Sequence, residues 1–148
     1  MAELRIRALA LCVFQHKGKI LVNQFDDVVK QQSFFRPVGG GIEFGETSAE
    51  AIVREVQEEL GLALKGLHLL GTLESIFVYD GKPGHEIVQV YDAVFEDARV
   101  YEQTHIDGHE TDGSPFTARW LDSSSFSAQA TLVPSGLYEL LKNAALLD

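Results

Sequence analysis

Apolar and polar residues alternate along the first part of the chain in a pattern that predicts β-strands. Residues 4–14 and 19–25 form two such runs, joined by a short polar turn, and the run ILVNQF is typical of a sheet with one polar face. Residues 26–32 are polar and predict a loop. Residues 33–37 then predict a short aromatic strand that leads the chain into three consecutive glycines.

The second half of the chain predicts further strands and a closing helix. The strands are expected at residues 67–79, 87–95 and 117–121. A turn rich in glycine and proline, residues 80–84, separates the first two of them. The helix is expected at residues 134–143, because Pro134 suits a first helical turn and leucines follow it at helical spacing.

The helix that follows the three glycines is defined by the signals at its two ends. Thr47 and Glu50 have the spacing of a capping box, and Gly61 can adopt the left-handed conformation that ends a helix. We therefore predict a helix at residues 48–60. The apolar stripe of this helix is expected to comprise Ala49, Ile52, Val53, Val56 and Leu60.

The face of this helix beside the apolar stripe carries Glu55, Glu58 and Glu59. Residues 40–62 contain six carboxylates and the single cation Arg54, so this segment has a net charge of −5 in a chain of net charge −10. Most charge runs are solvated faces, but such a face would gain from lysines at i,i+4 and has no use for the preceding glycines. Clustered carboxylates on a rigid element indicate a site for Mg²⁺ or Mn²⁺.

The single arginine of this helix is predicted to act on the same glutamates. Arg54 can pair with Glu50 or Glu58 along the helix, and such a pair would hold a metal ligand in place. The alternative is a surface ion pair that contributes little to stability.

The residues of this loop and helix resemble the Nudix box, G-x5-E-x7-R-E-U-x-E-E-x-G-U, in which U is a bulky apolar residue. The matching residues are Gly40, Glu46, Arg54, Glu55, Val56, Glu58, Glu59, Gly61 and Leu62, which satisfy every fixed position. The resemblance implies an α/β fold, the α/β/α sandwich around a mixed β-sheet that is built by a single Nudix hydrolase domain. The chain length agrees with one such domain over residues 1–148.

The resemblance also implies a reaction. Members of the family hydrolyse a nucleoside diphosphate linked to another group, by attack of water on phosphorus with divalent cations bound at the box. The implied metal ligands are Glu55, Glu58 and Glu59, with the Gly40 carbonyl as a further ligand, Glu46 acting from beside the metal or through a water, and Arg54 orienting the others.

Residues 96–116 are acidic and irregular, and they are predicted to form a long loop of the kind that often serves as a functional lid. Enzymes of the family often take another carboxylate from this region, and Glu110 is the candidate here. The alternative is that its acids are solvated loop residues. The general base is then either Glu59 or Glu110, and the sequence leaves that choice open.

Candidate substrate contacts flank the box on both sides. Arg36 and Phe35, together with Phe34, precede the glycines, although core packing is the commoner role of phenylalanine. Tyr79 lies 17 residues beyond Leu62, and an aromatic residue near that offset is associated in the family with dinucleoside polyphosphates. Packing is again the commoner role of a tyrosine at a strand end.

Composition and charge narrow the choice of partners. A net charge of −10 argues against nucleic acid or an anionic membrane as the partner. The lone Cys12 lies in an apolar run, which predicts a buried thiol, and no secretion signal is evident. We therefore expect a cytoplasmic protein that acts on a small nucleotide. The resemblance also allows a homodimer, since dimers are common in the family.

The sequence leaves the group attached to the nucleotide undetermined. A nucleoside triphosphate, an ADP-ribose-like molecule and a dinucleoside polyphosphate all remain candidates. The rival interpretation is a Nudix-like regulatory module that binds a nucleotide without cleaving it, although a module that only binds need not keep three crowded carboxylates.

Overall fold

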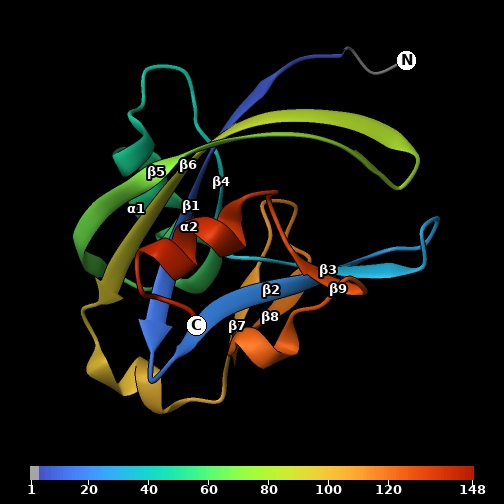
Figure 1. Ribbon diagram of the computed structural model, residues 1–148. Coiled ribbons are helices and arrows are strands. Elements are labelled where there is room, and N and C mark those ends of the chain that lie inside the picture. The colour runs from blue at the N-terminus through green and yellow to red at the C-terminus, as the bar shows by residue number, and fades with distance from the viewer. Residues whose placement is uncertain (1–3) are drawn as a thin grey trace.

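The computed structural model describes residues 4–148, which form one mixed β-sheet structure with two α-helices (Figure 1). The elements in chain order are β1 (Arg7–His16), β2 (Lys19–Asp27), β3 (Gln32–Arg36), β4 (Val38–Gly41), α1 (Ser48–Leu60), β5 (Leu64–Tyr79), β6 (Lys82–Phe95), η1 (Ala98–Glu102), β7 (His105–His109), β8 (Pro115–Leu121), η2 (Ser123–Ser125), β9 (Ala130–Leu132) and α2 (Leu137–Asn143).

The strands run in the order β5-β6-β1-β2-β3-β9, with β4 paired to β1, and β8 paired to both β2 and β7. The β1–β6 and β3–β9 pairs are parallel, whereas the other pairs are antiparallel. This mixed sheet agrees with the predicted architecture, and the long β5–β6 hairpin arches away from the body in Figure 1.

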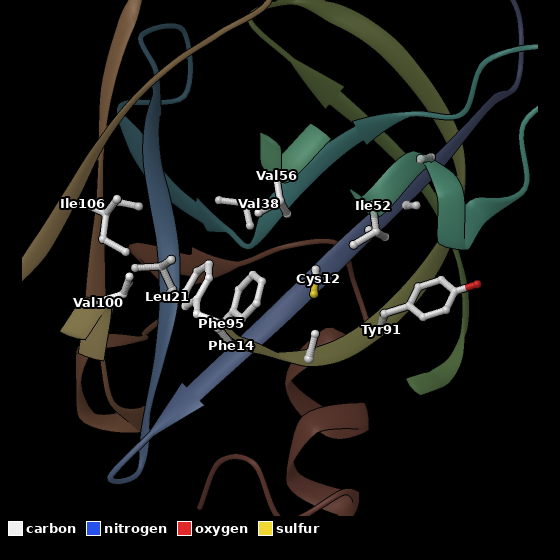
Figure 2. Packing of buried hydrophobic residues seen from close by; sticks show 14 residues of the cluster. Cys12, Phe14, Leu21, Val38, Ile52, Val56, Tyr91, Phe95, Val100 and Ile106 are labelled. Atoms are coloured by element: carbon white, nitrogen blue, oxygen red, sulfur yellow. The ribbon is translucent and has the colours of Figure 1, made fainter. Parts of the chain in front are cut away.

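The two helices cover opposite faces of the sheet, because alternate residues of β1 enter different cores. Cys12 and Phe14 pack in the cluster that contains Ile52 and Val56 of α1, as Figure 2 shows. Leu9, Leu11 and Val13 pack instead with Leu137 and Leu141 of α2. The predicted α/β/α sandwich is therefore confirmed.

The first of these cores has an aromatic centre and a buried thiol. The rings of Phe14 and Phe95 are stacked with centroids 3.8 Å apart. Cys12 is fully buried beside them, as predicted, and burial raises the pKa of its thiol.

The region predicted as one long loop, residues 96–116, is mostly regular structure, so that prediction was wrong. It contains η1, all of β7 and the start of β8. In β7 only Ile106 and Gly108 are buried, between charged and polar residues, which left little hydrophobic signal. Gly108 is required where α1 crosses β7, since a Cβ atom there would lie 2.6 Å from the Glu59 carbonyl oxygen.

Several element boundaries differ from the predicted ones; for example, β5 begins at Leu64 and β6 at Lys82, earlier than expected. The loop predicted at residues 26–32 shrinks to a turn at residues 28–31, because β2 runs on to Asp27. The turn predicted at residues 80–84 is only Asp80-Gly81, since Tyr79 already pairs with Lys82. The closing helix begins at Leu137 and not at Pro134, because its N-cap residue, Gly136, has a left-handed backbone conformation.

A buried carboxylate joins the tips of the β2–β3 and β5–β6 hairpins. Asp27, which is 1% exposed, accepts hydrogen bonds from the backbone N–H groups of Lys30 (3.1 Å) and Asp80 (3.0 Å). The Lys30 ammonium donates to the Val78 carbonyl at 2.7 Å, and the Tyr79 hydroxyl donates to the Asp26 carbonyl at 2.9 Å. The two hairpins are therefore held together at their tips.

Replacing Asp27 with alanine should lower the melting temperature by several degrees, because two backbone donors lose their acceptor. The hydrogen bond from Asp80 is the main cause that holds the pKa of Asp27 below its ordinary value of 3.8. The stabilisation is therefore present above pH 3.8 and lost as the pH falls below it. Thermal unfolding of wild type and Asp27→Ala between pH 3 and 7 measures this. A constant difference across that range would contradict it.

Candidate active site

The loop and helix that carry the acidic residues are built as their end signals predict. The Thr47 hydroxyl accepts from the Glu50 N–H at 3.1 Å, and the Glu50 carboxylate accepts from the Thr47 N–H at 3.0 Å, which completes the capping box. Gly61 ends α1 with φ 68°. Because Glu50 is used in the cap, Glu58 is the one of the two predicted partners that Arg54 contacts.

The rotation of α1 places two of the three predicted metal ligands in the interior. Glu55 and Glu59, one turn apart, are 6% and 8% exposed, whereas the Glu58 side chain is 54% exposed. Val53, predicted in the apolar stripe, is instead exposed, and Ala51 is buried in its place. The buried face of the helix is thus partly acidic, which requires a compensating charge nearby.

The Glu55 carboxylate lies directly against the glycine loop. A Cβ atom on Gly40 would be 2.8 Å from the Glu55 carboxyl carbon and 2.9 Å from both of its oxygens. Only glycine at this position leaves room for the Glu55 carboxylate. The oxygens of Glu55 therefore lie close to the backbone of Gly40.

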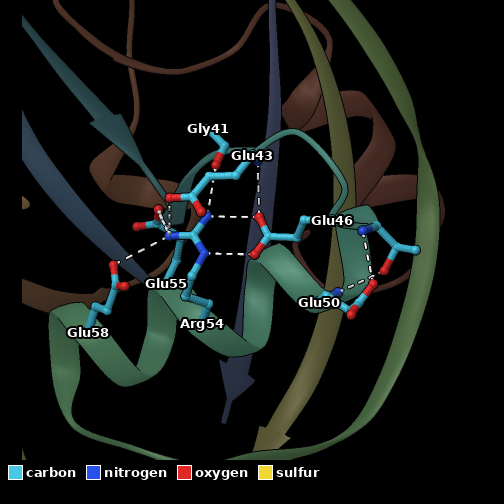
Figure 3. A network of polar contacts seen from close by, with 8 residues as sticks. Gly41, Glu43, Glu46, Glu50, Arg54, Glu55 and Glu58 are labelled. Atoms are coloured by element: carbon cyan, nitrogen blue, oxygen red, sulfur yellow. Dashed lines mark hydrogen bonds and ion pairs between the residues drawn. The ribbon is translucent and has the colours of Figure 1, made fainter.

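Arg54 supplies the compensating charge and connects most of the acidic cluster (Figure 3). Its guanidinium binds both oxygens of Glu46, with Nε 2.7 Å and Nη2 2.9 Å from them. Nη1 donates to Glu55 at 2.8 Å and to Glu58 at 3.3 Å, and Nη2 donates to the Gly41 carbonyl at 3.0 Å. The predicted contact of Arg54 with Glu58 is therefore present. The pair of Arg54 with Glu46 has shorter distances and uses both carboxylate oxygens.

These contacts shift the protonation of both partners. The hydrogen bond from Arg54 lowers the pKa of Glu46 to about 2, and the same bond is the largest of the causes that raise the pKa of Arg54. Both groups therefore stay charged throughout the neutral range.

Glu59 has the opposite shift. Burial raises the pKa of Glu59 to about 9, helped by a hydrogen bond and charge repulsion from Glu55 and by the charge of Glu110, while Arg36 acts in the opposite direction. Glu55 and Glu59 are thus buried carboxylates one helical turn apart, and burial keeps Glu59 protonated. A divalent cation would let both of them ionise.

A small pocket collects residues that are distant in sequence. It is lined by Glu59, Glu110, Arg36 and Asn23 among others, and its volume of about 10 Å³ is near what one water needs. The Asn23 amide donates to Glu110 at 3.4 Å. The structure thus places Glu110 and Arg36 beside Glu59, as the sequence suggested. Asn23 was missed, although a polar residue within the ILVNQF strand was a usable signal.

Two of the predicted substrate contacts lie elsewhere. Phe35 is on the other face of the sheet from Arg36 and packs against Phe126, with ring centroids 5.7 Å apart. The Tyr79 ring packs edge-on against Phe25 and Phe34, each at 6.2 Å. Arg36 stacks over Phe25 at 5.2 Å, and the Phe25 ring in turn packs against Tyr79.

The carboxylates are not preassembled as a metal cage. Within residues 4–148, no three Asp, Glu, His or Cys side chains converge in a geometry that would hold an ion. Arg54 contacts Glu55 and Glu58 and neutralises them in this arrangement. The oxygen-only donor set and the burial of both Glu55 and Glu59 nevertheless fit a hard cation such as Mg²⁺.

Comparisons with known proteins agree with this arrangement. The model of the NUDIX domain family matches residues 3–143. A curated relative from Mycobacterium tuberculosis, named as the mutator protein MutT4, is 42% identical over 52 residues, which are 35% of this chain and 21% of that protein. The chain thus spans about a fifth of that relative's length.

Solved structures share the fold at low sequence identity. A MutT NUDIX hydrolase from Burkholderia pseudomallei has a TM-score of 0.63 and 18% identity, over 94% of this chain and 98% of that one. A NUDIX hydrolase from Nitrosomonas europaea has a TM-score of 0.65 and 15% identity, over 97% of this chain and 92% of that one.

No helix in residues 4–148 has the length and hydrophobicity needed to cross a membrane.

Proposed function

Because the chain belongs to the NUDIX domain family, we propose that it hydrolyses a phosphoanhydride bond in a nucleoside diphosphate derivative with the help of Mg²⁺. Family membership supports hydrolysis of such derivatives in general, and NUDIX hydrolases generally use divalent metals. The observation that carries the proposal for this chain is the burial of two carboxylates one helical turn apart, Glu55 and Glu59, with Glu59 lining a pocket that also contains Arg36 and Glu110.

The residues that would hold the cation are Glu55, Glu58 and Glu59, with the Gly40 carbonyl as a further ligand. A cation held there would neutralise the diphosphate and would lower the pKa of an attacking water. Glu46 contributes indirectly, since it fixes Arg54, and Arg54 in turn orients Glu55 and Glu58. Mn²⁺ prefers the same oxygen ligands and should substitute for Mg²⁺.

Two further side chains complete the proposed chemistry. Arg36 faces the small pocket and offers its guanidinium to phosphate oxygens. Glu110 is not among the proposed ligands and accepts a hydrogen bond from the Asn23 amide, so we assign it the role of general base that would accept the proton from water.

A nucleotide panel tests the proposed reaction. Release of cleavage products should be measured by chromatography with Mg²⁺ for nucleoside triphosphates, ADP-ribose and dinucleoside polyphosphates, since the last two yield two phosphate esters and no inorganic phosphate. Calorimetric binding of the same compounds should be measured beside it. Hydrolysis of at least one compound, abolished by EDTA and restored by Mg²⁺ or Mn²⁺, is the expected result. Tight binding without release from any compound would instead support the regulatory binding module.

Metal binding should become stronger as the pH rises. Glu59 must lose its proton to bind a cation, and its pKa is raised to about 9 in the metal-free protein. The same shift means that the metal-free protein loses stability as the pH rises from the ordinary carboxyl range toward 9. The increase in melting temperature caused by Mg²⁺ should therefore be larger at pH 8.5 than at pH 6.5. An equal increase at both values would contradict this linkage.

A further inference from the structure

One face of the β2–β3 hairpin carries polar groups of the proposed site beside two aromatic rings. The strand register pairs Asn23 with Arg36 and Phe25 with Phe34. Paired residues lie on the same face of a sheet, and so do alternate residues of one strand. Leu21, two residues before Asn23, packs in the core that includes α1. All four side chains of the two pairs therefore lie on the side of the sheet that carries α1.

The guanidinium of Arg36 is held by a ring on this face. Its central carbon lies 5.2 Å from the centroid of the Phe25 ring, over the ring face. The negative face of an aromatic ring attracts a cation in this position. Within residues 4–148, none of the ion pairs involves Arg36. Its positive charge therefore remains available to an anionic ligand.

The stacked position of Arg36 is also a position at the small pocket. In the same structure, Arg36 lines this pocket together with Glu59 and Glu110. A long side chain loses rotamer freedom when it binds a ligand, and this loss weakens binding. Because the Phe25 ring restricts Arg36 beforehand, less freedom remains to be lost when a phosphate arrives at the pocket.

The Phe25 ring is in turn fixed by the tip of the β5–β6 hairpin. Tyr79 packs edge-on against Phe25, with ring centroids 6.2 Å apart, and its hydroxyl donates to the Asp26 carbonyl at 2.9 Å. Phe34 packs against Tyr79 at the same centroid distance. Both phenylalanines are half-buried. They differ in that the Arg36 guanidinium lies over Phe25, so Phe34 offers a matched comparison.

We propose that Phe25 is a positioning residue for Arg36, whose guanidinium it holds at the pocket in the orientation that binds the phosphates of the substrate. This inference rests on the function proposed above, in which Arg36 binds phosphate oxygens. Phe25 acts on the substrate through Arg36 alone. Asn23 has the corresponding relation to Glu110. One face of β2 thus orients both the phosphate-binding cation and the general base.

The test replaces the ring and measures kcat and KM for the nucleotide that the wild type hydrolyses fastest. Phe25→Leu should raise KM about fivefold, the effect of losing a partly exposed cation–π contact, with kcat changed less than about twofold. Phe25→Tyr keeps an aromatic face under Arg36 and should retain the wild-type KM. Phe34→Leu makes the same truncation beside Tyr79 and should also leave KM unchanged.

A double-mutant cycle separates positioning from a purely structural role. Arg36→Ala should raise KM about tenfold or more, the loss of one charged hydrogen bond. Adding Phe25→Leu to Arg36→Ala should raise KM no further, because the ring then has no guanidinium to hold. Thermal unfolding shows which variants fold. Phe25→Met, which also lacks a ring, replaces Phe25→Leu if that variant does not fold.

The outcomes separate this inference from the proposed reaction. If the wild type hydrolyses no compound of the panel, the reaction fails, and calorimetric dissociation constants of the best-bound nucleotide replace KM in the same comparisons. No binding of any compound would overturn both proposals. Hydrolysis by the wild type with an unchanged KM in Arg36→Ala would leave the reaction standing and overturn the inference.

Three further results would overturn the inference alone. Equal increases of KM in Phe25→Leu and Phe34→Leu would show a structural role that the two rings share. Additive increases in the cycle would show that Phe25 does not act through Arg36. A lower KM in Phe25→Leu would show that the ring holds Arg36 away from the phosphates.

Discussion

Replacing Glu59 with glutamine should lower kcat by about 10²–10³-fold, the loss expected when one charged group is removed from a preorganised site. The substitution keeps the size of the side chain and removes the negative charge that the proposed cation needs. The fold should survive, because burial and Glu55 keep Glu59 protonated and hence neutral at pH 7 in the metal-free protein. Circular dichroism measures the fold, and chromatography of the products measures Mg²⁺-dependent hydrolysis.

The comparison with other glutamates makes this result specific. Glu58→Gln should also lower kcat by orders of magnitude, because Glu58 is one of the three proposed metal ligands. Its side chain is more than half exposed, but Arg54 holds it together with Glu55. Glu102→Gln, on the exposed end of η1, is the matched control and should retain the wild-type rate. Near-wild-type turnover in both Glu58→Gln and Glu59→Gln would remove the basis for a metal site on α1.

Replacing Arg54 with alanine should destabilise the metal-free protein and reduce turnover together. Without the guanidinium, Glu46, Glu55 and Glu58 repel one another, and the Gly41 carbonyl loses its donor. We expect a loss of about 2 kcal/mol, below the value for a fully buried pair because a fifth of the arginine side chain is exposed. Urea unfolding measures the loss, and Mg²⁺ should restore part of it by neutralising the same carboxylates.

Lysine at this position should not restore either property. An ammonium group cannot bind both oxygens of Glu46 and also reach Glu55, as the planar guanidinium does. Arg99→Ala provides the control, since its pair with Asp97 is on the surface and its loss should change stability little. Full stability in Arg54→Ala without metal would show that the acidic cluster does not depend on this residue.

Local interactions made the first part of the site predictable. The capping box of Thr47 and Glu50 and the stop at Gly61 are set by neighbouring residues, and the helix bounds followed from them. The contact of Arg54 with Glu58 is likewise an i,i+4 contact. Glu46 became the better partner only because the loop folds back over the helix, which helical spacing cannot show.

Contacts between distant segments account for what the sequence missed. The strand β7 has only two inward-facing positions, Ile106 and Gly108, and it is recognised as a strand by its pairing with β8. Phe35 and Arg36 lie on opposite faces of the sheet because side chains alternate along β3. Which of these two faces meets α1 depends on how β3 pairs with β2.

The sequence by itself determined the acidic helix, its two ends, the glycine loop before it and the family to which these residues belong, because local hydrogen bonding and residue spacing define them. Only the tertiary structure decided which carboxylates are buried and that Asn23, Arg36 and Glu110 meet Glu59. Those features depend on strand register and on the packing of α1 against β7, which bring together residues that are far apart in the chain.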